Sequence, residues 1–86
     1  MSLSRNALRL HALIGERPGT TMSLESGSDV VEFQTVRNSY GDARLLANTA
    51  TQSGISVIEE IAAELELVQV ARREHDGKHQ FTFDLI

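Results

Sequence analysis

The amino-acid sequence predicts an α+β domain, in which a roughly five-stranded antiparallel sheet carries a helical pair on one face. Three observations indicate this class. Residues 67–86 alternate around an Asp-Gly pair, residues 56–65 carry one apolar stripe, and residues 8–33 contain short alternating segments. Alternation with a period of two is typical of strands, and a stripe with a period of 3.6 is typical of helices. The predicted order is β-β-β-α-α-β-β, in a single domain of residues 1–86.

Residues 4–16 are compatible with either a strand or a helix. A strand places four apolar residues on one face: Leu8, Leu10, Ala12 and Ile14. A helix buries a different stripe: Ala7, Leu10, Leu13 and Ile14. We favour the strand, because it would continue the apolar face of the two segments that follow it.

Those two segments are predicted to pair as a hairpin that turns at residues 27–28. In this register Leu24 faces Val31, and Met22 faces Phe33. Both pairs are apolar and fall on the same face of the sheet. We therefore expect Phe33 to lie in the core.

Two helices are predicted in the middle of the chain. The first spans residues 42–52, with Asp42 as its N-cap and Gly54 as the residue that ends it. The second spans residues 56–65 and begins with a capping box, in which the side chains of Ser56 and Glu59 each accept a hydrogen bond from the backbone of the other. Its apolar stripe consists of Val57, Ile58, Ile61, Ala62 and Leu65.

The C-terminal segment predicts a β-hairpin about Asp76-Gly77, because a type I′ turn needs positive φ at both central residues. One face of this hairpin pairs Val68 with Leu85, Val70 with Phe83, Arg72 with Phe81 and Glu74 with His79. The other face pairs Leu67 with Ile86, Gln69 with Asp84, Ala71 with Thr82, Arg73 with Gln80 and His75 with Lys78. The first face is mainly apolar and is expected to meet the core.

A metal site at this hairpin is not predicted, although His75 and His79 flank its turn. In the expected register the two imidazoles point to opposite faces of the ribbon. Zinc needs three or four ligands that converge on one point. We expect no metal ligands here, and a cross-strand pair of Glu74 with His79 instead.

Catalytic and cofactor-binding patterns are also missing from the sequence. There is no cysteine, no Gly-x-Ser-x-Gly elbow and no Walker A loop. Glu59 and Glu60 are adjacent on a helix face predicted to be exposed, where two carboxylates would not divide into an acid and a base. The sequence predicts neither an enzyme nor a cofactor.

A winged helix is the alternative fold if the N-terminus is helical. Ala50, Gly54, Ile55 and Ser56 then stand at the alanine, glycine, aliphatic and serine positions of a helix-turn-helix, which this part of the chain resembles. The resemblance implies a transcriptional regulator domain. The helix that would enter the major groove, residues 56–66, has four glutamates and no lysine or arginine, and the net charge of the chain is −4. Nucleic acid is therefore an unfavourable partner.

The predicted location is the cytoplasm. The longest apolar runs have three residues, whereas a membrane-spanning helix needs about 20. The N-terminus has no signal-peptide core, and the absence of cysteine fits a reducing compartment. No membrane partner is expected.

The second face of the predicted sheet mixes apolar and charged residues, which is typical of a surface that meets a partner. Six residues are predicted to bind that partner: Leu13, Val30, Leu67, Ala71, Arg73 and Ile86. We expect a non-catalytic protein-interaction or regulatory module that forms a homodimer and binds another protein. In element order and size the chain also resembles small acidic secretion chaperones, which dimerise and bind other proteins. A small enzyme or ligand-binding domain with its site between subunits is a further alternative.

Overall fold

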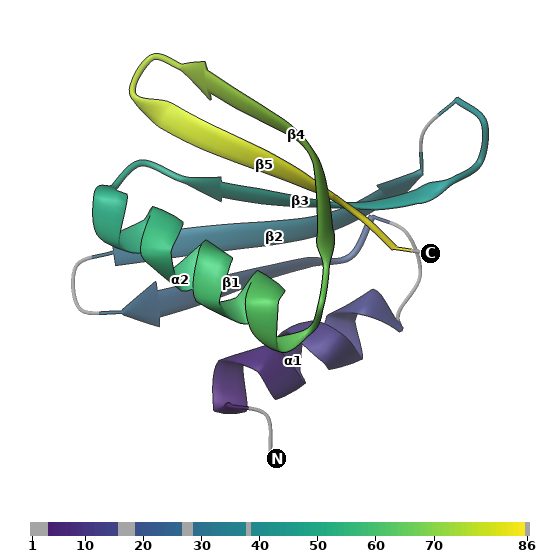
Figure 1. Ribbon diagram of the computed structural model, residues 1–86, viewed down its shortest axis with the longest axis horizontal. Coiled ribbons are helices and arrows are strands. Elements are labelled where there is room, and N and C mark those ends of the chain that lie inside the picture. Colours follow the sequence, from purple (N-terminus) through teal and green to yellow (C-terminus); the bar gives the residue numbers. More distant parts are fainter. Residues whose placement is uncertain (1–3, 16–18, 27–28, 38, 86) are drawn as a thin grey trace.

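The computed structural model describes residues 4–15, 19–26, 29–37 and 39–85 (Figure 1). The helices of this part are α1 (Arg5–Ile14) and α2 (Gln52–Glu64). The strands are β1 (Thr21–Ser26), β2 (Asp29–Arg37), β3 (Ala43–Thr49), β4 (Val68–His75) and β5 (Lys78–Asp84). All strands pair antiparallel in one sheet of order β1-β2-β3-β5-β4. The predicted α+β class, with five antiparallel strands, is confirmed, but the element order is α-β-β-β-α-β-β and not the predicted β-β-β-α-α-β-β.

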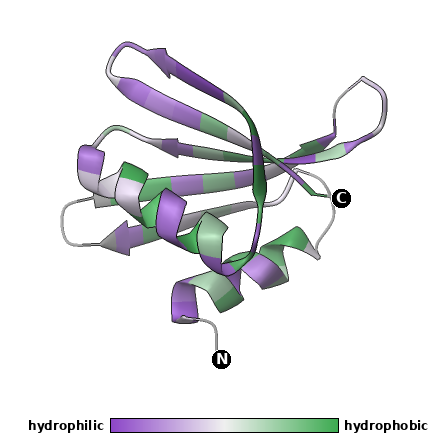
Figure 2. Cartoon of the chain, in the orientation of Figure 1, coloured by the Kyte–Doolittle hydropathy of each residue, from purple (hydrophilic) through white to green (hydrophobic). Residues whose placement is uncertain are grey.

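Both helices lie on the same face of the sheet, which we call the covered face (Figure 1). The opposite side, the open face, carries no described helix. Hydrophobic and hydrophilic residues alternate along the central strands (Figure 2), as expected when one face is buried. The core combines residues of the covered face and of both helices: Ala7, Leu10, Leu13, Leu24, Val31, Phe33, Leu45, Ala47, Ile55, Ile58, Ile61, Phe81 and Phe83.

The strand predicted for residues 4–16 is wrong, because this segment forms α1. Ser4 is the N-cap, and its hydroxyl accepts a hydrogen bond of 3.2 Å from the backbone N–H of Ala7. Ala7, Leu10 and Leu13 are buried, whereas Leu8 is 55% exposed. The helical stripe wins over the alternating pattern because α1 covers β1 and β2, the part of the apolar face next to α2.

The helix predicted for residues 42–52 is also wrong, because residues 43–49 form β3 at the centre of the sheet. Leu45, Ala47 and Thr49 are buried, and they alternate with half-buried residues. Compared with other ordinary residues, leucine and alanine favour a helix by a few tenths of a kcal/mol per residue, and by about 0.7 kcal/mol at most. Pairing on both sides, with β2 and β5, outweighs that preference. A helix-turn-helix needs its first helix in this segment, so the winged-helix alternative is wrong as well.

The predicted pairing of the two strands before β3 is confirmed. Met22 pairs with Phe33 and Leu24 pairs with Val31. Residues 27–28, the predicted turn, lie outside the described part of the chain. On the covered face Phe33 is buried between Met22 of β1 and Ala47 of β3, as expected for a core residue.

Helix α2 begins one turn earlier than predicted, so the capping box at Ser56 is wrong. The N-cap is Thr51, whose hydroxyl accepts a 2.9 Å hydrogen bond from the N–H of Gly54. Ser56 lies inside the helix, is exposed, and donates to the carbonyl of Gln52 over 3.4 Å. Gly54, predicted to stop a helix, is instead buried in the first turn of α2.

Replacing Thr51 with alanine is expected to lower the free energy of unfolding by about 0.5 to 2 kcal/mol, because the cap of α2 is lost. Ser56→Ala is the matched control and should change stability by less than about 0.5 kcal/mol. Urea unfolding followed by circular dichroism measures both. A larger loss at Ser56 than at Thr51 would contradict this start of α2.

The C-terminal hairpin turns at the predicted residues, since Asp76 has a φ of 52° and Gly77 a φ of 75°. Close to the turn, the predicted pairs are confirmed: His75 with Lys78, Glu74 with His79, Arg73 with Gln80, Arg72 with Phe81 and Ala71 with Thr82. Beyond them the register shifts between Gln69 and Ala71. The structure pairs Gln69 with Phe83 and Val68 with Asp84, so the predicted pairs Val70 with Phe83, Val68 with Leu85 and Gln69 with Asp84 are wrong. A bulge of this kind bends an edge strand and increases its twist.

Candidate functional site

Along β1, β2, β3 and β5, the open face is formed by the residues that alternate with core residues, and along β4 by the residues that pair with them. Cross-strand pairing arranges these residues in four rows across the sheet. In order from β1 toward β4, the rows are Glu25, Val30, Lys78 and His75; then Ser23, Glu32, Asn48, Gln80 and Arg73; then Thr21, Gln34, Leu46, Thr82 and Ala71; and then Val36, Arg44, Asp84 and Val68. The last two rows contain more apolar side chains than the first two.

Charges are separated across this face. The acidic residues Glu25 and Glu32 lie on β1 and β2, and all of their neighbours of opposite charge in the first two rows belong to the β4–β5 hairpin. These are Arg73 and Lys78, both exposed, and His75 pairs with Lys78 beside them. Asymmetric charge of this kind steers and orients a partner.

Polar side chains in the centre of the open face are paired with each other. The Gln80 amide donates to the Asn48 side-chain oxygen over 3.1 Å. In the last row the Arg44 guanidinium forms a half-buried ion pair of 2.9 Å with Asp84. Leu46, half-buried, lies between these two pairs on β3. The centre of the face is therefore electrically balanced, while its two edges are not.

Three of the predicted partner-binding residues lie on the open face, Val30 on β2 and Ala71 and Arg73 on β4, with β3 and β5 between them. Val30 is 46% exposed, and Ala71 and Arg73 are exposed on β4. The placement of the other residues on this face was wrong in two cases. Leu13 belongs to α1 and is buried on the side of the helix that faces the core. Leu67 is half-buried against the core, between α2 and β4. Ile86 lies outside the described residues.

The covered face is closed near β4 without a helix. The guanidinium of Arg72 lies 4.8 Å from the centre of the Phe81 ring, in a cation–π contact. Phe81 is only 1% exposed, and its ring stacks with that of Phe83 at 6.3 Å. The hairpin therefore protects its own aromatic residues, and the covered face needs no partner at this position.

The histidines at the hairpin turn lie on opposite faces, as the register predicted. His79 is mostly buried, and its Nδ1 lies 3.9 Å from the carboxylate of Glu74, which forms the predicted cross-strand pair. His75 is exposed, and its Nε2 lies 3.1 Å from Asp76. Within residues 4–15, 19–26, 29–37 and 39–85, no three His, Asp or Glu side chains are grouped so that they could hold a metal ion.

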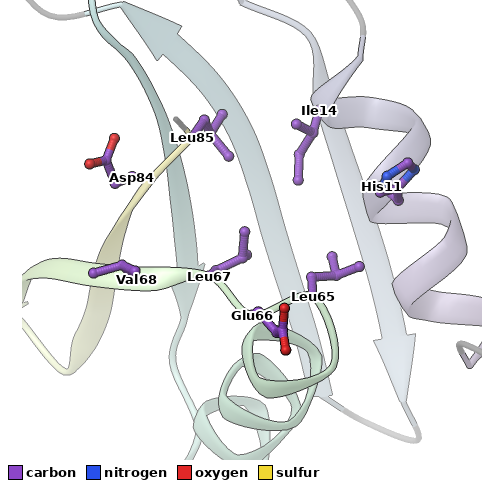
Figure 3. A pocket seen from close by; sticks show the side chains of 8 residues that line it. All are labelled: His11, Ile14, Leu65, Glu66, Leu67, Val68, Asp84 and Leu85. Atoms are coloured by element: carbon purple, nitrogen blue, oxygen red, sulfur yellow. The ribbon is translucent and has the colours of Figure 1, made fainter.

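A hollow of about 390 Å³ lies at the other end of the core, where both helices end (Figure 3). Four half-buried aliphatic side chains surround it: Ile14, Leu65, Leu67 and Leu85. His11, Glu66 and Asp84 lie at its margin, and Asp84 is already paired with Arg44. The sequence did not predict this hollow, because residues 4–16 were expected in the sheet and not above it.

Comparisons with protein-family models, with curated proteins and with solved structures found no significant match. Neither described helix is long and apolar enough to cross a membrane.

Proposed function

We propose that this chain is a non-catalytic protein-interaction module that self-associates through the open face of its sheet. One observation carries the proposal: both helices cover the same face, and the other face presents exposed apolar residues between charged ones. Val30 and Val68 are among the most exposed large apolar side chains, and both belong to the open face. Interfaces that form and dissociate have such a mixed composition.

The open face suits docking better than the edge at β4 does. Strands β1 and β4 are the two edges of the sheet, and β4 carries a register shift between Gln69 and Ala71 together with two arginines, Arg72 and Arg73. Bulges and charged residues are the devices by which proteins prevent pairing at an edge. The open face has no such protection. The polar side chains at its centre are half-buried and already paired within the chain, so they do not oppose contact with a partner.

The size of the open face is close to what a specific dimer needs. Five strands at about 4.8 Å spacing span about 24 Å, and about seven residues at about 3.3 Å each span about 23 Å. In flat projection, two such faces hide roughly 1,100 Å², near the roughly 1,200 Å² at the lower end of specific interfaces. Self-association would therefore use the whole face.

Ala71→Arg is expected to abolish self-association while the fold is kept, because it places a charge within the interface. Sedimentation equilibrium at about 10 to 100 μM measures the association, and circular dichroism checks the fold. Leu8→Glu is the control, since Leu8 is also exposed but lies on the outer side of α1. A wild-type chain that stays monomeric up to about 100 μM would contradict the proposed self-association.

A further inference from the structure

A symmetric contact between two open faces allows two arrangements when the strands of both copies are aligned. Sheets that pack face to face keep their strand directions within about 30° in the aligned class. The same surface then meets itself about a two-fold axis that lies between the sheets. This axis runs either across the strands or along them.

An axis across the strands places each strand over the same strand of the second copy. It also reverses the order of the rows, so that the second row lies over the third. Glu32 then lies one row, about 6.6 Å along the strand, from Glu32 of the second copy, and Arg73 lies equally close to its own copy at the opposite edge. Like charges brought together in a desolvated contact oppose binding, so this arrangement is unfavourable.

An axis along the strands reverses the strand order of the second copy and leaves the rows in register. Because the order is β1-β2-β3-β5-β4, β1 lies over β4, β2 over β5, and β3 over itself. Glu25 then faces His75 of the second copy. Glu32 faces Gln80 of the second copy, and Arg73 of that copy is offset sideways by one strand, about 4.8 Å within the sheet.

The centre of this arrangement is also compatible with contact. Strand β3 lies on the axis, so the half-buried Leu46 meets its own copy there. Arg44 approaches its copy as well, but each Arg44 is neutralised by Asp84 at 2.9 Å. An apolar contact at the centre with charged residues at the rim is the usual composition of an interface.

We infer that two copies pack open face to open face about an axis parallel to the strands, so that the acidic β1–β2 half of each copy binds the basic β4–β5 half of the other. The inference rests on the proposed function, since it specifies the partner and the orientation at the same surface. The rim contacts are exposed, so salt weakens the association.

Charge reversal tests the orientation, because Glu32 and Arg73 are both exposed and outside the core. Glu32→Lys alone and Arg73→Glu alone should each weaken self-association at least tenfold, as each places like charges together. An equimolar mixture of the two variants should restore association to near the wild-type level, since both contacts become attractive in the mixed dimer. A chain that carries both changes should also dimerise. Glu60→Lys, on α2, is the matched control and should have no effect.

Sedimentation velocity at low salt, with one variant labelled, reads out all these mixtures. A wild-type dimer without rescue in the mixture overturns the orientation and leaves the proposed self-association intact. The same holds if each single variant dimerises as tightly as the wild type. A wild-type chain that is monomeric overturns both the orientation and the proposed function.

Discussion

Phe33→Ala is expected to lower the free energy of unfolding by about 3 to 5 kcal/mol, the usual loss when a buried phenylalanine is truncated. Phe33 is 1% exposed at the centre of β2, between Met22 of β1 and Ala47 of β3. The substitution leaves a cavity in the core between the sheet and the helices. Small domains have a total stability of about 5 to 15 kcal/mol. The variant would therefore keep only a small part of the stability of the wild-type chain.

Urea unfolding monitored by circular dichroism measures this loss. Phe33→Leu should lose much less, because most of the apolar volume is kept. Tyr40→Ala is the exposed control, since Tyr40 is 89% exposed in the connection between β2 and β3, and a change within about 0.5 kcal/mol is expected there. A loss below about 1 kcal/mol at Phe33 would contradict its position in the core.

Gly54→Ala is expected to destabilise the fold by about 1 to 3 kcal/mol, the usual cost of overpacking. A Cβ at Gly54 would overlap with the hydroxyl of Thr49 on β3 and would lie 2.8 Å from the Cβ of Thr49 and 3.0 Å from the hydroxyl of Thr51. The first turn of α2 would have to leave the sheet, and the cap at Thr51 would be lost with it. The gain of about 1 kcal/mol in helix propensity from glycine to alanine acts in the opposite direction.

Thermal and urea unfolding of two further variants test this steric cause. Gly15→Ala is the matched control, because the nearest atom to a Cβ there is the carbonyl oxygen of Ala12 at 3.5 Å, an ordinary contact. Thr49→Ala removes the overlapping hydroxyl, so the double variant Thr49→Ala, Gly54→Ala should lose less than the sum of the single losses. Additive losses would mean that the contact between Gly54 and Thr49 does not limit the packing of α2.

Elements whose geometry depends on neighbours in the chain could be predicted from the sequence. The turn at Asp76-Gly77 needs positive φ at both residues, and few residue pairs tolerate that. The pairing of β1 with β2 followed from the alternation of apolar residues about a two-residue connection, and Leu24 with Val31 is confirmed. For the same reason, the α+β class and four of the five strands could be anticipated, whereas β3 was predicted as a helix.

The assignment of residues 4–16 and 42–52 required the tertiary structure. Each segment contains both an alternating and a helical apolar pattern, and Leu10 belongs to both patterns in the first of them. The helix α1 forms because an apolar sheet face beside α2 needs cover. The strand β3 forms because β2 and β5 pair with it on both sides. Local preferences of a few tenths of a kcal/mol cannot decide between such patterns.

The candidate site was only partly predictable for the same reason. The sequence alone determined that Val30 alternates with core residues of its strand, and that Ala71 and Arg73 alternate with Arg72, which pairs with Phe81, so their common face was predicted correctly. The tertiary structure removed Leu13 from that face and buried it, because a helix places its side chains by a period of 3.6 and not of two. It also brought Glu32 and Arg73 to opposite halves of one surface. Their relation depends on the strand order, and strand order is set by pairing between distant segments, which no local pattern contains.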